Sequence, residues 1–291
     1  MEIFEAWPLA LLVVAGLLGL VVGSFLNVVA YRIPIMMERA WRAQCEELKT
    51  QPFTAPAHVA DDKRFDLWWP PSACPGCGQA IAAQHNVPVI GFLWLKGRCA
   101  KCGTKISPRY PLVEAFAALL ALTTAYVFGP TWQTVAALGF TWTLLALTLI
   151  DLDHKLLPDS LTLPLLWAGL LVNVPGLFTT LSSSVVGAAA GYLALWTVYK
   201  LFKLMTGKEG MGYGDFKLLA AIGAWLGWQL LPVVILLSAV VGSVVGIALI
   251  AFGGRSSQTA IPFGPYLAAA GFIALLWGER LVQLYQAWFF R

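Results

Sequence analysis

Carboxylates gather in two short stretches of otherwise apolar sequence. One is LIDLDHKLLPD, residues 149–159, and the other is KEGMGYGDFK, residues 208–217. Asp151 ends one long apolar run and Asp215 begins another. Two carboxylates that approach each other share a proton, because both cannot ionise side by side. One then acts as a base toward water and the other as an acid toward a carbonyl. This pattern indicates the chemistry of an aspartic protease.

Other interpretations of these charged residues stay open. Asp159 follows Pro158 and precedes an apolar run, which favours helix capping. Asp153 lies in a short loop, where solvation is the ordinary state of an acid. Lys217, beside Asp215, is placed to extend its ammonium group to a membrane interface. Carboxylates at helix ends also serve transporters, so a carboxylate-lined transporter with a zinc-bound domain is an alternative hypothesis.

The glycines before Asp215 resemble a nucleotide or S-adenosylmethionine loop. Such a loop needs a strand before the glycines and a helix after them, but an apolar helical run precedes them here. We therefore expect irregular backbone that lines a protein cavity. Gly212 and Gly214 are expected to take positive φ and to keep side chains away from Asp215.

Four cysteines follow the pattern C-x2-C-x21-C-x2-C: Cys74, Cys77, Cys99 and Cys102. Two close pairs of thiolates suit tetrahedral zinc, as in a zinc ribbon. A redox pair and unpaired thiols are the alternatives. Gly78 and Gly103 are expected to let each knuckle turn toward the metal. Four ligands close a site, so this zinc is expected to be structural. Cys45 is expected to be an inert thiol, and His58 and His85 ordinary loop residues.

The composition indicates a membrane protein. Only 12% of the 291 residues are charged, about half the usual share for a soluble domain, which is about 25%. The net charge of +4 is small and gives no case for nucleic acid. The first apolar run, Trp7 to Ala30, has no basic residue before it, which favours a retained helix over a signal peptide.

Seven further apolar runs follow, at about 111–128, 132–151, 159–178, 183–205, 215–229, 231–253 and 261–282. Each approaches the roughly 20 residues that span a bilayer. We expect an all-α polytopic membrane protein with about eight transmembrane helices; seven is the alternative, because the boundary near Trp228 is the weakest. The expected domains are a first helix (1–30), a small cytoplasmic zinc-ribbon-like domain (31–110) and a transmembrane peptidase core (111–291).

The basic residues predict the orientation. Segment 31–110 holds 11 of the 19 Lys and Arg, and basic loops stay in the cytoplasm. The N-terminus is then outside, and Asp151 and Asp215 both lie at the cytoplasmic face of the membrane.

Five features together resemble the bifunctional type IV prepilin leader peptidase/N-methyltransferases. They are the double C-x2-C pattern and the stretches GSFLNVVAYRIP (23–34), GRCAKCGTKISPRYPLVE (97–114), LTLIDLDHKLLPDSLTLP (147–164) and GMGYGDFKLLAAIGAWLGW (210–228). They occur in order over most of the chain, and their combination is highly specific.

The resemblance implies a role for each matching residue. Asp151 and Asp215 match the two catalytic aspartates, and the four cysteines match the cytoplasmic zinc-type motif. Gly97 matches a glycine associated with methylation; the next residue, often Lys in the family, is Arg98 here. The implied protein lies in the bacterial inner membrane and cleaves the basic leader of prepilins and pseudopilins. It then methylates the new N-terminal residue with S-adenosylmethionine, supporting pilus biogenesis or type II secretion. A peptidase that lacks methylation is the nearest alternative.

Overall fold

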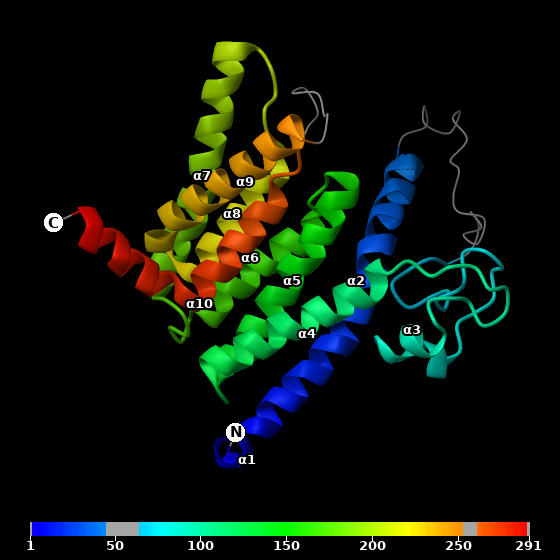
Figure 1. Ribbon diagram of the computed structural model, residues 1–291. Helices are drawn as coiled ribbons and strands as arrows, with labels where there is room; N and C mark the ends of the chain where they lie inside the picture. The colour runs from blue at the N-terminus through cyan, green and yellow to red at the C-terminus, as the bar shows by residue number, and fades with distance from the viewer. Residues whose placement is uncertain (1, 45–63, 253–260, 290–291) are drawn as a thin grey trace. The chain divides into compact units, whose positions relative to one another are not determined.

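The described part of the chain is helical. The computed structural model describes residues 2–44, 64–252 and 261–289, and within these ranges it holds helices and two isolated β-bridges but no strand (Figure 1). Cys45, His58 and the basic loop at 253–260 lie outside the described residues. The chain divides into two compact units, Met1–Tyr126 and Val127–Arg291. Each unit is treated separately below.

The first unit is built on two long helices. Its elements are α1 (Glu2–Ala6), α2 (Pro8–Gln44), the 3-10 helix η2 (Ala83–Asn86), α3 (Ile90–Trp94) and α4 (Arg109–Phe128), whose last turn reaches the unit boundary. In α2, Gly19 and Gly23 repeat at a spacing of four. A Cβ on Gly19 would meet Ala118 Cα at 2.5 Å, and one on Gly23 would meet Glu114 Cα at 2.7 Å. Such small residues let the backbones of membrane helices approach closely.

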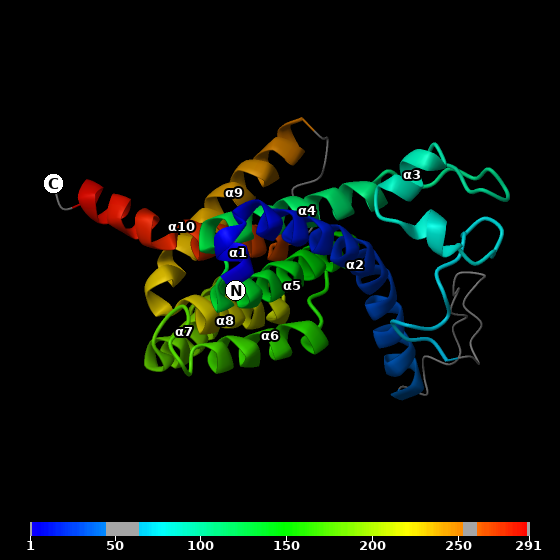
Figure 2. The ribbon, with the colours of Figure 1, turned by 90° about the horizontal axis from the view of Figure 1, so that it is seen from below.

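The helix α2 is longer than the sequence predicted. It continues 14 residues beyond Ala30, although Pro34 lies inside it. Proline removes one helical hydrogen bond and bends a helix, and Figure 2 shows α2 changing direction along its length. Arg42 and Glu38 then stabilise the last turns as a pair four residues apart, at 2.9 Å.

The second unit surrounds one short buried helix. Its elements are α5 (Trp132–His154), α6 (Asp159–Val172), α7 (Leu181–Thr206), α8 (Tyr213–Leu226), η3 (Trp228–Leu230), α9 (Leu231–Ala251) and α10 (Gly264–Phe289). Of the 14 residues of α8, 11 are buried. A Cβ on Gly187 of α7 would lie 2.3 Å from the backbone of Gly223 in α8. The two helices therefore touch through backbone.

Polar side chains satisfy the buried end of α8. The amide of Asn173 donates to the carbonyls of Ala224 and Trp225 at 2.9 and 3.0 Å. Its oxygen accepts from the backbone N–H groups of Phe178 and Thr179. Ser184 donates to the Ala224 carbonyl as well. The last carbonyls of a helix lack intrahelical partners, so these contacts fix where α8 ends.

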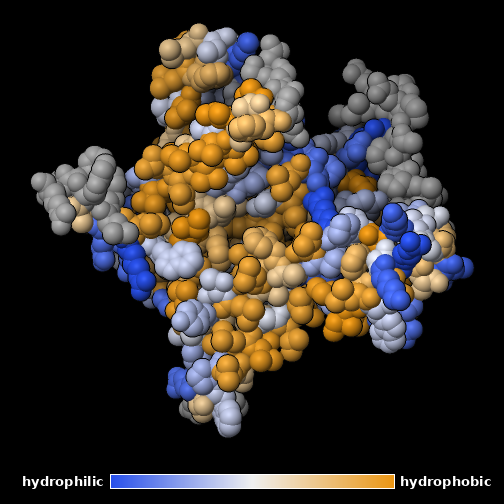
Figure 3. Space-filling model, viewed as in Figure 1, coloured by the Kyte–Doolittle hydropathy of each residue, from blue (hydrophilic) through white to orange (hydrophobic). Residues whose placement is uncertain are grey.

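Each of the eight predicted apolar runs carries a helix. Five of the described helices are long and apolar enough to cross a membrane: Pro8–Gln44, Arg109–Phe128, Trp132–His154, Leu181–Thr206 and Trp228–Ala251. The helix α6 is shorter, and the 14 residues of α8 reach about 21 Å, less than the roughly 30 Å of hydrocarbon. Hydrophobic side chains cover most of the visible helical surface (Figure 3), as expected for helices that face lipid.

Candidate functional site

Asp151 lies buried in the last turn of α5. The helix ends there because Lys155 takes the left-handed conformation and its N–H returns to the Asp151 carbonyl at 2.9 Å. The residue is only 5% exposed. Its Oδ2 accepts a hydrogen bond of 3.0 Å from the backbone N–H of Gly264, the first residue of α10. The first N–H groups of a helix have no partner within it, so α10 supplies a donor aimed at this carboxylate.

Asp215 lies at the N-terminal end of a helix, whereas Asp151 lies at a C-terminal end. Asp215 is the third residue of α8 and is 8% exposed. A carboxylate near a helix N-terminus is stabilised by the helix dipole. The expected positive φ at Gly212 and Gly214 was wrong: Gly212 is extended at φ −81, and Gly214 is already helical. Residue 214 is a glycine for a packing reason, because a Cβ there would lie 2.7 Å from Leu157 Cβ.

The two carboxylates share one neighbourhood. Asp151 is 5% exposed and Asp215 is 8% exposed. Leu157 links their surroundings, because it packs against Gly214, which precedes Asp215, and against Gly264. A Cβ on Gly264 would lie 3.2 Å from Leu157 Cδ2 and 2.6 Å from Asp151 Oδ2. Three segments far apart in sequence, around residues 151–157, 214–215 and 264, therefore assemble one buried site.

The acids nearby have other partners. Asp153 is exposed, as expected, but the prediction that it lies in a loop was wrong, because it belongs to the last turn of α5. The prediction that Asp159 caps α6 was wrong, because Pro158 is the N-cap residue and no side chain caps the helix. Asp159 instead binds Lys217 through both carboxylate oxygens, at 2.6 and 2.7 Å. The Lys217 ammonium therefore ends on a carboxylate of α6.

The loop before α8 carries one further ion pair. Lys203 Nζ donates to Glu209 Oε1 at 2.6 Å and holds the pKa of Glu209 below its usual value. Two features then fix the start of this loop: the ion pair and Gly207, which ends α7 in the left-handed conformation at φ +69. The glycine-rich stretch therefore joins two helices, and no strand precedes it in the described chain, which excludes the nucleotide-loop interpretation.

The four cysteines of the first unit come together. Their sulfur atoms all lie within 4.8 Å of one another, and those of Cys74 and Cys102 are 3.7 Å apart. Tetrahedral zinc with Zn–S bonds of about 2.3 Å places its sulfurs about 3.8 Å apart. The spacing of the sulfurs therefore fits a zinc ion.

The backbone shapes this cluster as two knuckles. Single β-bridges, Ala73 with Ala80 and Arg98 with Lys105, close one hairpin around each cysteine pair. Gly78 and Gly103 take positive φ, +68 and +71, as predicted for the turns. The Thr104 hydroxyl lies 3.1 Å from Cys102 Sγ and is the largest of several hydrogen-bonding contacts that lower the pKa of that thiol to about 6. A lowered pKa favours the thiolate, which is the form that binds a metal.

Gly97 forms a tight turn between α3 and the second knuckle. Its φ is +68, and a Cβ would meet the Phe92 ring at 3.0 Å. Its N–H donates to the Phe92 carbonyl, and its own carbonyl accepts from Ile106. The neighbouring Arg98 is exposed. Only glycine adopts such a φ at no steric cost, so the shape of this turn depends on Gly97.

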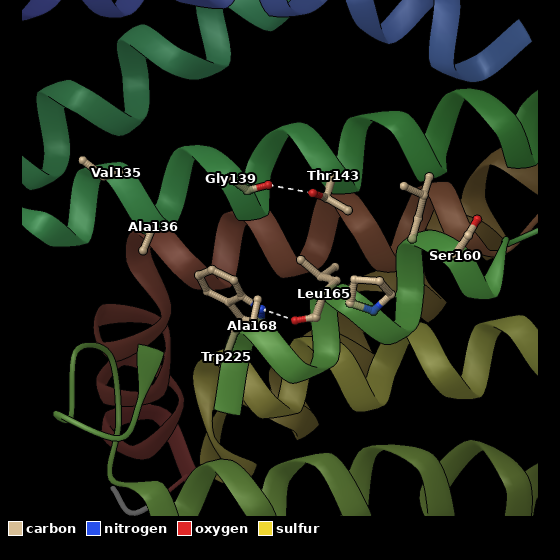
Figure 4. A pocket seen from close by; sticks show the side chains of 10 residues that line it. Val135, Ala136, Gly139, Thr143, Ser160, Leu165, Ala168 and Trp225 are labelled. Carbon is tan, nitrogen blue, oxygen red and sulfur yellow. Dashed lines mark hydrogen bonds between the residues drawn. The ribbon is translucent and has the colours of Figure 1, made fainter. Parts of the chain in front are cut away.

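An open apolar groove lies elsewhere in the second unit, between α5 and α6 (Figure 4). It has a volume of about 340 Å³. Trp225 lies among its lining residues and donates to the Leu165 carbonyl at 2.8 Å. Thr143 and Ser160 bring the only side-chain hydroxyls to a lining that is otherwise apolar. Neither Asp151 nor Asp215 lines this groove, so it is separate from the carboxylate site.

Two residues of the site were missed by sequence reasoning. Gly264 lies 113 residues from Asp151 and acts through its backbone N–H, for which no side-chain pattern exists. Leu157 is an ordinary apolar residue in sequence, and only its contacts distinguish it. A glycine between Phe263 and Pro265 was the single available signal.

Comparisons with known proteins find matches over nearly the whole chain. Residues 17–128 match the bacterial peptidase A24 N-terminal domain, and residues 138–247 match the type IV leader peptidase family. The chain is 54% identical over 284 residues to a prepilin leader peptidase/N-methyltransferase of Stutzerimonas stutzeri, covering 98% of this chain and 96% of the relative. Proteins of the same name from Aeromonas salmonicida and Pseudomonas aeruginosa are 53% and 52% identical, each over 98% of this chain and 97% of the relative. No solved structure matches. The chain belongs to the type IV leader peptidase family.

Proposed function

We propose that this protein removes the basic leader of prepilins and pseudopilins at the cytoplasmic face of the membrane, with Asp151 and Asp215 as its catalytic pair. One observation carries the assignment of residues: two carboxylates distant in sequence are buried in one neighbourhood, linked through Leu157 and Gly264, in a chain whose relatives are named prepilin leader peptidases. Structural acids are rarely buried without a cationic partner. Neither carboxylate has one among the contacts described, whereas Asp159 pairs with Lys217.

The proposed cleavage needs no nucleophilic side chain. One carboxylate, as the anion, takes a proton from water while the oxygen of that water attacks the scissile carbonyl carbon. The other carboxyl, protonated, donates to the carbonyl oxygen. The tetrahedral intermediate then collapses, the C–N bond breaks, and the leaving amine takes a proton. The N–H of Gly264 holds Asp151 in one orientation throughout.

The topology fits the substrate. A prepilin has a basic leader followed by a hydrophobic helix, so its scissile bond lies where the leader leaves the membrane. We place eight spans in the bilayer, the N-terminus outside, and both carboxylates at the cytoplasmic interface. The domain limits that accompany this topology are 1–30, 31–110 and 111–291. The absence of basic residues from the loops at 129–131, 179–182 and 229–231 supports this orientation.

The first unit is proposed to serve methylation. The zinc ligands would be Cys74, Cys77, Cys99 and Cys102, whose spacing fits the ion. Four protein ligands close such a site, so the metal stabilises the fold of a segment with little core. S-adenosylmethionine supplies an electrophilic methyl group to the amine freed by cleavage. The exposed guanidinium of Arg98 suits a carboxylate such as the one this donor carries, and Gly97 shapes the turn that presents it.

Mass analysis of a co-expressed prepilin separates the candidate functions. The bifunctional enzyme yields a pilin that lacks its leader and carries one methyl group on the new N-terminus. A shortened but unmethylated product would reduce the function to peptidase alone. An intact prepilin beside correctly inserted enzyme would contradict the proposal and favour the transporter.

A further inference from the structure

The first unit exposes large apolar side chains on the part of the chain that was expected to lie in the cytoplasm. Trp68 is 78% exposed, Leu93 66% and Trp94 72%. Trp69 and Ile90 are exposed as well. Soluble surfaces rarely gather this much apolar area without a partner. We propose that the Trp68–Trp69 turn and the helix α3 insert into the cytoplasmic leaflet, so that the cysteine domain lies on the membrane surface. The two elements are called the interfacial patch below.

The Trp68–Trp69 turn is tied to α2 within its apolar half. The ring of Trp68 stacks on Phe25 with centroids 5.6 Å apart. Arg32, which is itself buried, donates to the carbonyls of Asp66 and Pro70 at 2.7 and 2.6 Å. Phe25 precedes Arg32 by seven residues, or about 10 Å of helix, on the side of the apolar run. Trp68 therefore lies nearer the membrane core than the first charged residue of α2.

The turn itself is rigid. One oxygen of Asp66 accepts from the backbone N–H groups of Trp68 and Trp69 at 2.8 and 2.7 Å, and the other accepts from Arg64 at 2.6 Å. The bond from Trp68, with these others, holds the pKa of Asp66 below its usual value. Both tryptophans are thus presented in a fixed conformation rather than on a loose loop.

The helix α3 is tied to α4 in the same way. Glu114, buried in the second turn of α4, accepts from the backbone N–H of Val89 at 2.7 Å. Val89 immediately precedes α3 and has φ +59, an unfavourable conformation for a β-branched residue. Glu114 lies five residues, or about 7.5 Å, inside the helix that begins at Arg109. The start of α3 is therefore held at the level of the lipid headgroups or just below them.

The charge around the patch suits the inner leaflet. The sequence from residue 67 to residue 113 contains no Asp or Glu and five basic residues: Lys96, Arg98, Lys101, Lys105 and Arg109. The cytoplasmic leaflet is anionic and attracts such segments. Tryptophan is the residue most typical of the membrane interface, where its ring is apolar and its N–H meets water. Charge, composition and depth thus indicate the same occupant, a lipid surface.

The interfacial patch predicts where methylation takes place. Gly97 lies three residues beyond the end of α3, so its turn would lie at the membrane surface. If the proposed function holds, the amine freed by cleavage emerges at that same surface. Lipid contact of α3 does not depend on either activity, so the two proposals fail separately.

Photo-crosslinking tests the insertion in the full-length protein. Benzoylphenylalanine replaces Leu93 in one variant and Ala100, exposed at the tip of the second knuckle, in a control variant. Both are reconstituted in nanodiscs of phosphatidylcholine and phosphatidylglycerol and irradiated. We expect lipid adducts by mass spectrometry at residue 93 and none above the dark control at residue 100. Equal adduct levels at the two positions, or crosslinks from residue 93 to protein alone, would overturn the proposal.

A second measurement does not depend on the unnatural residue. The Trp94→Phe variant is compared with the wild-type protein in nanodiscs of brominated and of ordinary phosphatidylcholine. The difference in fluorescence between the two proteins is the emission of Trp94. We expect brominated lipid to quench this emission strongly. Removed emission that is identical in both lipids would place Trp94 in water and contradict insertion.

Discussion

Replacing Gly264 by alanine tests how the site is assembled. Gly264 does not take positive φ, so the backbone accepts alanine without strain. The new Cβ would lie 2.6 Å from Asp151 Oδ2, whereas ordinary contact begins at 3.4 Å. The carboxylate must therefore move by about 0.8 Å and lengthen its 3.0 Å bond to the Gly264 N–H. Such a bond to a charged group contributes about 1.5–3 kcal/mol.

We expect this displacement to lower kcat about 100-fold, since misplacing a catalytic group by about 1 Å costs roughly that factor. The assay is cleavage of purified prepilin by enzyme in nanodiscs, with kcat and KM determined separately. The matched control is Gly139→Ala in α5, the helix of Asp151, because a Cβ at Gly139 would meet nothing within 4 Å. Equal kcat values for the two variants, with both proteins folded, would refute the reasoning that α10 positions Asp151.

Three further substitutions test other parts of the structure. Gly97→Ala forces a non-glycine residue to φ +68, at a cost of about 1–2 kcal/mol; we expect pilin that is cleaved but poorly methylated, and normal methylation would exclude the turn from that activity. Cys74→Ser with Cys77→Ser is expected to reduce bound zinc from about one ion per chain to none by elemental analysis, and retained zinc would disprove the site. Asn173→Leu leaves buried groups at the end of α8 unpaired, each costing about 1–3 kcal/mol; we expect a clearly lower Tm in detergent, and an unchanged Tm would contradict the capping role.

Much of the site could be predicted because its chemistry resides in side chains with recognisable spacing. The cysteine pattern predicted a cluster whose sulfurs do lie together. The acids Asp151 and Asp215 stood out because charge is rare in apolar sequence, and both are buried at helix ends of the second unit. Their actual catalytic role stays a prediction until the variants are measured.

The remainder depends on contacts that sequence patterns do not carry. The partner of Asp151 is the backbone N–H of Gly264, which any residue type would possess. The glycines near Asp215 were interpreted as conformational, but Gly214 serves close packing against Leu157. Long-range packing decided each of these cases.

The contacts of the cysteine domain could not be predicted from the sequence either. Its polar sequence and basic residues predicted a small cytoplasmic domain but did not indicate how it contacts the helices on either side. The stacking of Trp68 on Phe25 and the bond from Val89 to Glu114 tie it to α2 and α4. Neither contact follows from composition, because each joins residues far apart in sequence.

Substitution of the two carboxylates by amides tests the central claim most directly. Asp151→Asn and Asp215→Asn keep the shape of each side chain but remove its ability to exchange a proton. Asp153→Asn, two residues from Asp151 and exposed, is the matched control. Each variant is co-expressed with a prepilin, and the N-terminus of the pilin is read by mass spectrometry. We predict uncleaved prepilin with either of the first two variants and normal cleavage with the third. Cleavage at the wild-type rate by Asp151→Asn or Asp215→Asn would contradict the account.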